Sequence, residues 1–249
     1  KPLFKGHYQP RVPADLGYYD LRLPEVREEQ ALLAREAGIE GFCYYHYWFG
    51  NGNRLLERPF KEVLEIGRPN FPFCLCWANH SWTNKTWHNS QRRVKENILM
   101  EQLYPGKEDY INHFYSVLPA FQDKRYIKID GKPIFLIYNP YDFKDVGLFM
   151  KIWKELAQQN GLSEIFFIGM TSSTLSFKIN TKGEKIYTFP NLKSSAEIYQ
   201  HLLNVGFNAV NSFGKRRGEM LYSNKYKNQT KKIFSKLGFN FGTEIFDYS

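Results

Sequence analysis

Unbroken apolar segments that alternate with helical segments constrain the fold of this chain more than any other feature. Three of them read FPFCLCW (residues 71–77), PIFLIY (133–138) and EIFFIGM (164–170). Such segments are typical of parallel strands that are covered on both faces, because strands with one wet face alternate apolar and polar residues instead. The helical segments fit the crossover connections that parallel strands require. The sequence therefore predicts an α/β fold with a parallel sheet.

Helix and turn signals set the boundaries of the expected elements. Residues 23–38 have a proline near the start, acidic residues in the first turn and a glycine at the end, as helices often do. Asp130 and Gly131 supply the turn of an expected hairpin. Helices are expected at 23–38, 58–69, 108–123, 143–161 and 195–206, and strands at 39–49, 71–79, 97–104, 126–138, 164–170 and 207–213.

Polar and aromatic residues gather where each expected strand ends. Such clusters occupy residues 44–49, 77–82, 138–140, 171–173 and 211–212. A (β/α)8 barrel distributes its active site in this way, over loops at one rim. A doubly wound nucleotide-binding sheet is disfavoured, because neither G-x-G-x-x-G nor a P-loop motif occurs in the sequence. We therefore expect one TIM-type barrel domain that covers residues 1–249.

The net charge of +9 suits an anionic partner, but its distribution does not suit nucleic acid. Basic residues are dispersed over the first 200 positions and concentrate in residues 214–238. We interpret that segment as a solvated face. Contact with an anionic membrane or a lipid-linked acceptor is the alternative.

Three cysteines, Cys43, Cys74 and Cys76, lie inside apolar segments. An odd number of cysteines at expected buried positions indicates free thiols in a reducing compartment, so we expect a cytoplasmic protein. Cys74 and Cys76 would face the same side of one strand. No second pair at zinc-finger spacing accompanies them, and we expect neither a metal nor a cofactor. No run of 18 apolar residues occurs in the sequence.

Aromatic residues make up 17% of the chain and are dense after expected strands. The segment WANHSWTNKTWHN (residues 77–89) sets Trp77, Trp82 and Trp87 among asparagines and histidines. A sugar ring offers apolar C–H faces and hydroxyl groups, so its site combines aromatic rings with polar side chains. We favour sugar binding here over the alternative, a loop pinned by packed tryptophans.

Groups for acid–base chemistry are few at the expected strand ends. His46 is either a functional group or a hydrogen-bonded packing residue. A glycoside hydrolase needs two carboxylates beside the scissile bond. Glu101, Asp142 and Asp247 are the nearest candidates, and each fits a structural or solvated role better than a catalytic one. The acids therefore lie outside this segment, or the protein binds without cleaving.

Five long motifs occur in one order along the chain: KPLFKGHYQPRVPADLGYYDLR, GIEGFCYYHYWF, LLERPF, FPFCLCWANHSWT and RYIKIDGKPIFLIYNP. Together they resemble the WbsX-type family of glycosyltransferase-like proteins of bacterial polysaccharide biosynthesis. That family is similar in turn to the barrels of glycoside hydrolase family 99. The resemblance covers most of residues 1–211.

The resemblance implies a barrel, a sugar substrate and a role in building O-antigen or capsular polysaccharide. Family members usually open with a strand ending in a YLPQFHP-like motif and close with an NEWAEG-like motif that carries carboxylates. Neither motif occurs here, so we expect an incomplete barrel without its first and last strands. Many relatives have WANENW where this chain has WANHSW, so that His80 replaces an acid.

The rim residues that match the family are the expected site. The candidates for proton transfer or catalytic hydrogen bonding are His46, His80 and Glu101. The expected substrate-binding residues are Tyr45, Tyr47, Trp48, Trp77, Asn79, Trp82 and Tyr138.

Alternation along a strand puts Tyr45 and Tyr47 on one face and His46 and Trp48 on the other, and the sequence does not decide which face lines the barrel. Taken together, these features predict a glycosyltransferase-like enzyme of bacterial surface-polysaccharide assembly that acts on a sugar or an activated sugar. Two alternatives stay open: a family-99-like glycoside hydrolase and a non-catalytic sugar-binding barrel fragment.

Overall fold

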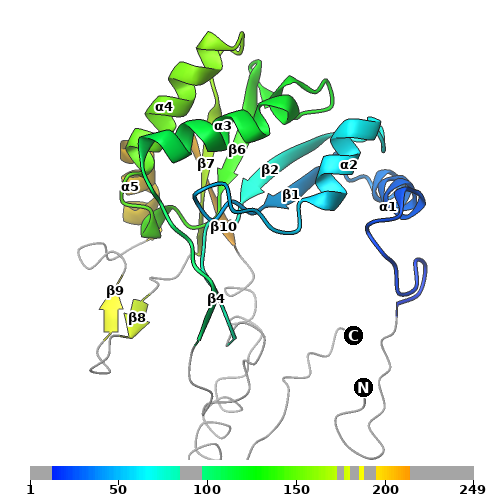
Figure 1. Ribbon diagram of the computed structural model, residues 1–249, viewed down its shortest axis with the longest axis horizontal. Helices are drawn as coiled ribbons and strands as arrows, with labels where there is room; N and C mark the ends of the chain where they lie inside the picture. Colours follow the sequence, from blue (N-terminus) through cyan, green and yellow to red (C-terminus); the bar gives the residue numbers. More distant parts are fainter. Residues whose placement is uncertain (1–12, 85–96, 173–176, 180–184, 188–194, 214–249) are drawn as a thin grey trace, which may run out of the picture. The chain divides into compact units, whose positions relative to one another are not determined.

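The computed structural model describes residues 13–84, 97–172, 177–179, 185–187 and 195–213 (Figure 1). Contacts between Cα atoms divide the chain into two compact units. The larger comprises Lys1–Met170 with Tyr199–Val210, and the smaller comprises Thr171–Ile198 with Asn211–Ser249. The larger unit holds the helices and strands that carry the expected rim residues.

The elements follow the expected order along the chain. Most strands begin or end within a few residues of the predicted boundary. The elements are α1 (Pro24–Glu36), β1 (Phe42–His46), α2 (Arg58–Ile66), β2 (Phe73–Trp77), β3 (Trp82–Thr83), β4 (Ile98–Met100), α3 (Lys107–Gln122), β5 (Lys128–Ile129), β6 (Lys132–Ile137), η2 (Pro140–Asp142), α4 (Val146–Gln159), β7 (Phe166–Ser172), β8 (Phe177–Ile179), β9 (Lys185–Tyr187), α5 (Ser195–Val205) and β10 (Ala209–Phe213).

The main sheet has the strand order β1-β2-β6-β7-β10, with β5 paired to β6 at the side. β1 and β2, β2 and β6, and β6 and β7 are parallel, so the predicted parallel sheet is confirmed. The predicted hairpin β5–β6 is also confirmed, and its turn residues Asp130 and Gly131 both have positive φ angles, as a tight hairpin turn requires. Strands join the sheet in chain order, without the reversal that defines a doubly wound fold.

The register between strands settles which side chains share a face. One row across the sheet contains Tyr44, Leu75, Phe135 and Phe167, and the next row along the strands contains Tyr45, Cys76, Leu136 and Ile168. The first row faces the helices. Phe60 of α2 lies 5.2 Å from the ring of Tyr44, and Trp153 of α4 lies 4.7 Å from the ring of Phe135. We call the opposite face, which carries the second row, the inner face.

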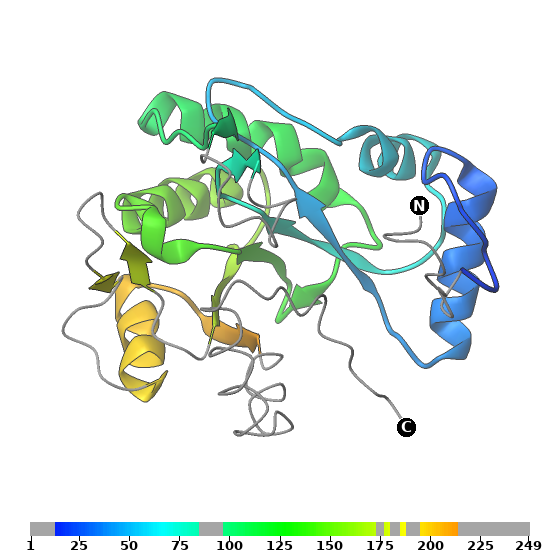
Figure 2. The same ribbon diagram turned by 90° about the horizontal axis from the view of Figure 1, so that it is seen from below.

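The described helices of the larger unit pack on the same face of the sheet. Figure 2 shows α1, α2, α3 and α4 following one another along one side of it. Under α1, Ala31 and Ala34 pack against Phe71, next to Phe42 at the start of β1. The described part of the parallel sheet is therefore singly wound, with α1 to α4 on one face.

The inner face curves enough for β2 to contact β7 across the intervening strand β6. The Cys76 thiol donates a hydrogen bond to the sulfur of Met170 at 3.4 Å, and both side chains are buried. Flat neighbouring strands lie about 4.8 Å apart, so two strands separated by a third would lie about 9.6 Å apart. Side chains bridge such a gap most easily where the sheet is concave.

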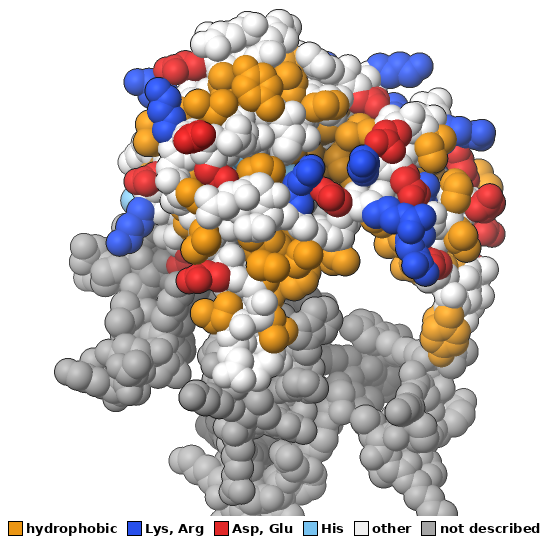
Figure 3. Space-filling model, viewed as in Figure 1, with side chains coloured by type: hydrophobic (Ala, Val, Ile, Leu, Met, Phe, Trp, Pro, Cys, Tyr) orange, Lys and Arg blue, Asp and Glu red, His pale blue; other side chains and the backbone are white. Residues whose placement is uncertain are grey.

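The charged residues of α1 and α2 pair with one another, and Figure 3 shows blue and red side chains mixed over this part of the surface. Arg27 is buried between the helices and donates to Glu62 at 3.0 Å, and Arg68 donates to Glu28 at 2.8 Å. Mixed signs of this kind do not form an anionic-ligand patch. Among the described residues, no helix is long and apolar enough to cross a bilayer.

Candidate functional site

Five aromatic side chains form a continuous arc where β1, β2 and β6 end, and we call Tyr45, Tyr47, His80, Trp82 and Tyr138 the aromatic arc. The ring of Tyr47 lies 5.3 Å from Trp82 and 6.4 Å from Tyr45. Tyr45 lies 6.0 Å from Tyr138, which lies 5.3 Å from His80. Parallel strands end at one edge, so residues far apart in sequence meet there.

The arc is open to ligands, unlike the core beneath it. The side chain of Tyr45 is 51% exposed, and the other four members of the arc are half-buried. Tyr45 belongs to the inner face, opposite the helices, and stands in register with Cys76. The ring of Tyr138 contacts Tyr45 from the end of β6. The arc therefore lies over the carboxyl end of the inner face.

A tight turn after β1 fixes the near end of the arc. β1 ends at His46, earlier than predicted, because the chain folds back so that Phe49 N–H bonds Asn53 O at 2.9 Å. Gly50 has φ +91°, and a Cβ atom there would lie 3.0 Å from Leu103, so only glycine fits without strain. The buried ring of Phe49 packs edge-on against Trp82, 5.5 Å away.

The arc is electrically neutral at physiological pH. Burial raises the pKa of Tyr45 to about 12, with smaller contributions from neighbouring Cys76 and Tyr138, and burial also raises the pKa of Tyr47. Burial lowers the pKa of His80, so its imidazole is uncharged at pH 7. Neutral rings with hydroxyl and imidazole groups suit a ligand that offers both C–H faces and hydroxyls.

Trp48 and Trp77, both expected to bind substrate, lie in the core under the helices. Trp48 is 4% exposed and Trp77 is 1% exposed. The Trp48 indole donates to Asp109 at 3.0 Å and stacks on His113, while the Trp77 indole donates to the Trp48 carbonyl at 2.9 Å. Neither indole is accessible to a ligand in this structure, so we omit both from the site.

His46 points away from the arc and pairs with His113 of α3, which sequence reasoning missed. Their Nε2 atoms lie 2.8 Å apart. Burial lowers the pKa of His46 to about 3, and burial together with His46 holds the pKa of His113 well below its usual value. Both rings are therefore neutral, and the alternative role considered for His46, a hydrogen-bonded packing residue, describes its surroundings.

The hydrogen bond between two neutral imidazoles needs one Nε2–H donor and one bare Nε2 acceptor. His113 Nδ1 is buried and has no partner. An unpaired buried N–H costs more than an unpaired lone pair, so we assign the Nε2 proton to His113 and make His46 the acceptor. The pair joins β1 to α3 without any charge.

Asn79 is also structural. Its side chain is fully buried, accepts a hydrogen bond from Asn139 N–H at 2.7 Å, and donates to the Asn139 carbonyl at 2.8 Å and to the Tyr104 hydroxyl at 3.0 Å. The acceptor and one donor of the amide therefore bind the loop after β6, and the other donor binds Tyr104, which lies between β4 and α3. Asn79 fixes the positions of His80, which is its own chain neighbour, and of Tyr138, which is the chain neighbour of Asn139.

Replacing Asn79 by alanine is expected to lower the free energy of unfolding by about 2–3 kcal/mol, because it removes the side-chain partner of the Asn139 N–H and carbonyl groups and one of the hydrogen bonds of the Tyr104 hydroxyl. Urea unfolding of the variant measures this change. Asn112 is exposed on α3, and its replacement by alanine should change stability by less than about 0.5 kcal/mol. Equal effects of the two variants would contradict the structural role of Asn79.

Two of the three acidic candidates, Glu101 and Asp142, lie within the described residues. Glu101 is exposed and directly follows Met100, the register partner of Trp82. Asp142 accepts a hydrogen bond from the Asn139 side chain at 2.6 Å. Asp247, together with Trp87 and the basic segment at 214–238, lies outside the described residues.

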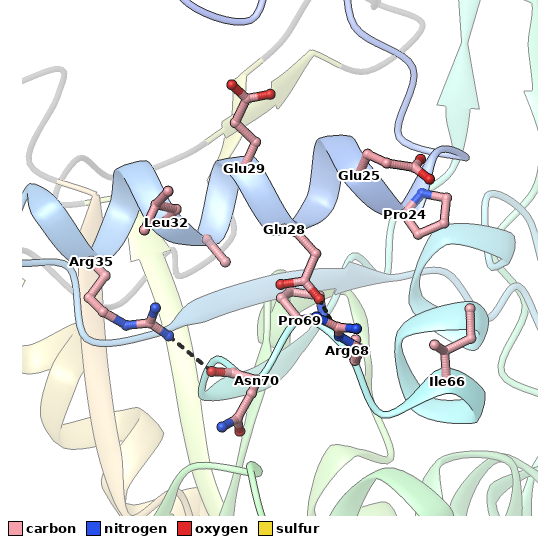
Figure 4. Close-up of a pocket in the computed structure, with 11 residues that line it drawn as sticks. Pro24, Glu25, Glu28, Glu29, Leu32, Arg35, Ile66, Arg68, Pro69 and Asn70 are labelled. Atoms are coloured by element: carbon pink, nitrogen blue, oxygen red, sulfur yellow. Dashed lines mark hydrogen bonds and ion pairs between the residues drawn. The ribbon is translucent and has the colours of Figure 1, made fainter.

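A separate surface depression of about 780 Å³ lies between α1 and the connection from α2 to β2 (Figure 4). Both arginines in its lining are engaged locally: Arg68 binds Glu28, and Arg35 donates to the Asn70 carbonyl at 3.0 Å. Residues 69–70 precede β2, so the depression lies toward the amino ends of the strands. Parallel α/β folds bind ligands at the opposite, carboxyl ends.

Comparison with known proteins gives distant structural and closer sequence relatives. A solved glycoside hydrolase-like protein has a TM-score of 0.43 and 17% identity, over 65% of this chain and 47% of that one. The GH99 endo-α-mannosidase of Bacteroides thetaiotaomicron has a TM-score of 0.31 and 12% identity, over 80% of this chain and 68% of that one. Both likenesses are too weak to carry an argument.

The sequence relatives are the uncharacterized protein WxcX of two strains of Xanthomonas campestris pv. campestris, B100 and ATCC 33913. Each is 37% identical over 166 residues, which cover 66% of this chain and 23% of WxcX. The chain thus spans about a quarter of the length of these relatives. The profile of the family described as Glycosyltransferase WbsX matches residues 1–248, and the chain therefore belongs to the WbsX glycosyltransferase family.

Proposed function

We propose that the aromatic arc binds a sugar residue of the substrate. The observation that carries this proposal is the run of solvent-accessible rings, from Trp82 through Tyr45 to Tyr138, at the carboxyl ends of three parallel strands. Tilted and edge-on rings offer apolar surface to sugar C–H groups, and the Tyr45 hydroxyl, whose pKa burial raises to about 12, stays protonated as a hydrogen-bond donor. Of the expected substrate-binding residues we retain Tyr45, Tyr47, Trp82 and Tyr138.

We further propose that the described sheet is part of a (β/α)8 barrel whose rim carries the arc. The chain-order sheet, the helices on a single face and the concave inner face support this architecture. A barrel also explains why Tyr45 is exposed on the inner face of the sheet. In this fold the loops at the carboxyl ends of the strands build the active site.

The reaction that fits the family is glycosyl transfer from an activated donor during assembly of a bacterial surface polysaccharide. Membership in the WbsX glycosyltransferase family supports it. Three free cysteines support a reducing, cytoplasmic setting. An anionic lipid-linked acceptor would contact a part of the chain other than the paired charges of α1 and α2.

His80 and Glu101 are our remaining candidates for proton transfer. His80 touches Tyr138 in the arc, and its lowered pKa keeps the imidazole free to accept a proton from a sugar hydroxyl. Glu101 follows the strand that pairs with Trp82. We withdraw His46, since its Nε2 atom is occupied by His113.

Replacing Tyr45 by alanine is expected to weaken sugar binding at least tenfold, because it removes the most exposed ring of the arc, and Tyr138→Ala should act similarly. Saturation-transfer NMR measures this loss, as binding of the purified chain to a panel of bacterial O-antigen and capsular oligosaccharides. Tyr115→Ala is the matched control, since Tyr115 is 48% exposed on α3, on the helix side. Equal binding by all three variants would refute the arc as the sugar site.

Incubation of the full-length protein with nucleotide-activated sugars and these oligosaccharides distinguishes glycosyl transfer, glycoside hydrolysis and sugar binding without catalysis. Extension of the oligosaccharide supports glycosyl transfer. Release of a reducing sugar without a donor would replace the proposal with glycoside hydrolysis. Binding with neither product would assign a sugar-binding role.

A further inference from the structure

Three thiols gather on the inner face, and no role of the aromatic arc uses them. Cys43 of β1 stands in register with Cys74 of β2, and Cys76 lies two residues further along the same face. Contrary to the sequence-based expectation that all three are buried, Cys43 is exposed, whereas Cys74 and Cys76 are buried. Within the described residues, β1 pairs with β2 alone and forms the edge of the sheet.

The pairing of residues between β1 and β2 allows only one of the two buried thiols to form a disulfide with Cys43. Neighbouring strands lie about 4.8 Å apart, within the Cα separation of about 4.4–6.8 Å that disulfides adopt. The Cα atoms of Cys43 and Cys74, as register partners, therefore lie at a suitable separation. A diagonal pair such as Cys43 and Cys76 lies about 7–8 Å apart, which is too far. Cys76 is also engaged with Met170.

The three thiols fall into two kinds. A reactive thiol is the one that an oxidant attacks first, and a resolving thiol then forms the disulfide with it. Interaction with the Cys74 thiol holds the pKa of Cys43 well below its usual value, which favours an accessible thiolate. Interaction with Cys43 and burial raise the pKa values of Cys74 and Cys76, which stay protonated. The thiolate is the nucleophilic form of cysteine and the form that peroxides oxidise. Within the described residues, the thiols are not arranged to hold a metal ion.

We propose that Cys43 is a peroxide-reactive site that is converted to a Cys43–Cys74 disulfide linking β1 to β2. The Cys43 sulfur attacks a peroxide oxygen, the O–O bond breaks, and the departing oxygen leaves as water or an alcohol after protonation. Cys43 becomes a sulfenic acid. The Cys74 sulfur then attacks the sulfenic sulfur while its proton passes to the departing oxygen, the S–O bond breaks, and water leaves. Two thiols are oxidised and one peroxide is reduced.

Treatment of the complete chain with hydrogen peroxide, followed by intact mass measurement without reductant, tests the proposal. The expected product is lighter by about 2 Da, as a disulfide requires, and peptide mapping should join Cys43 to Cys74. The Cys76→Ser variant should still form the Cys43–Cys74 disulfide. Cys43→Ser should not, and in Cys74→Ser a sulfenic acid on Cys43 should be trapped by dimedone.

A disulfide to Cys76, or no oxidation of Cys43 by peroxide that oxidises free cysteine, would overturn the proposal. Thermal unfolding confirms that each variant is folded. If Cys74→Ser does not fold, alkylation of the unmodified chain by iodoacetamide decides the question. Cys43 should then react at least tenfold faster than Cys74 and Cys76 at pH 6. Equal rates would refute a distinct reactive thiol.

Discussion

Replacing Trp77 by alanine is expected to lower the free energy of unfolding by about 3–5 kcal/mol, the cost of removing a large aromatic side chain from a core. Its indole is buried, donates a hydrogen bond to the Trp48 carbonyl, and packs against His113 and Phe149 at 4.7 Å and 5.3 Å. The cavity would open between β2, α3 and α4, where the surrounding rings cannot all move to fill it. Urea unfolding followed by circular dichroism measures the change.

Trp82→Ala provides the comparison, because Trp82 is a half-buried tryptophan only five positions further on. Its replacement should cost less than about 1.5 kcal/mol, since surface-facing positions contribute less to stability. It should weaken sugar binding, since its ring contacts Tyr47 in the arc. A stable Trp77→Ala variant that specifically loses sugar binding would contradict the placement of Trp77 in the core.

Acidification below pH 6.5 is expected to destabilise the protein through His46 and His113. Both have folded-state pKa values below the usual value of about 6.5, so the unfolded chain binds protons first as the pH falls. Stability is therefore complete above about pH 6.5 and is lost toward the folded pKa of His46, about 3. Between pH 6 and pH 5 the two groups together should remove about 2–3 kcal/mol, at about 1.4 kcal/mol per pH unit for each fully titrating histidine.

Urea unfolding at half-unit steps from pH 7.5 to pH 5 measures this loss. His113→Gln is the matched variant, because its side-chain amide can still donate to His46 Nε2 and only one titrating group remains. The loss between pH 6 and pH 5 should fall to about half. Independently, NMR titration should show both imidazoles neutral down to pH 5 in the folded chain. A histidine that titrates near pH 6.5 would exclude the neutral pair.

The sequence was sufficient for the parallel sheet but not for the site. Unbroken apolar strands and helix signals such as the proline at the start of α1 are local features, and the elements formed where those features predicted. The segment from Tyr44 to Trp48 has aromatic rings on both faces, so the twofold period of a strand cannot identify the ligand face. That choice depends on α2, α3 and α4, which cover the face of Tyr44 and His46.

The same limit explains the tryptophans and the asparagine. Trp77 and Trp82 are both tryptophans and lie in the same short segment. Only Trp77 is buried, and His113, 36 positions further along the chain, helps to bury it. Asn79 looks like a free polar residue until Asn139 and Tyr104 are brought beside it. Tyr45, Tyr47, Trp82 and Tyr138 stay a prediction as sugar-binding residues, and the sequence offered no local signal for His113.

The chain-order sheet also bears on how the protein is made. β1, β2, β6 and β7 stand side by side in the order in which they leave the ribosome. Each emerging strand therefore finds its neighbour already synthesised, and each connecting helix can dock before the next strand appears. α2 connects β1 to β2, α3 lies in the longer connection from β2 to β6, and α4 connects β6 to β7. Each loop closure therefore joins strands that follow one another in the sheet, and its entropic cost grows only slowly with the length of the connection. Synthesis from the amino end can thus build this sheet one strand at a time, with no strand waiting for a distant partner.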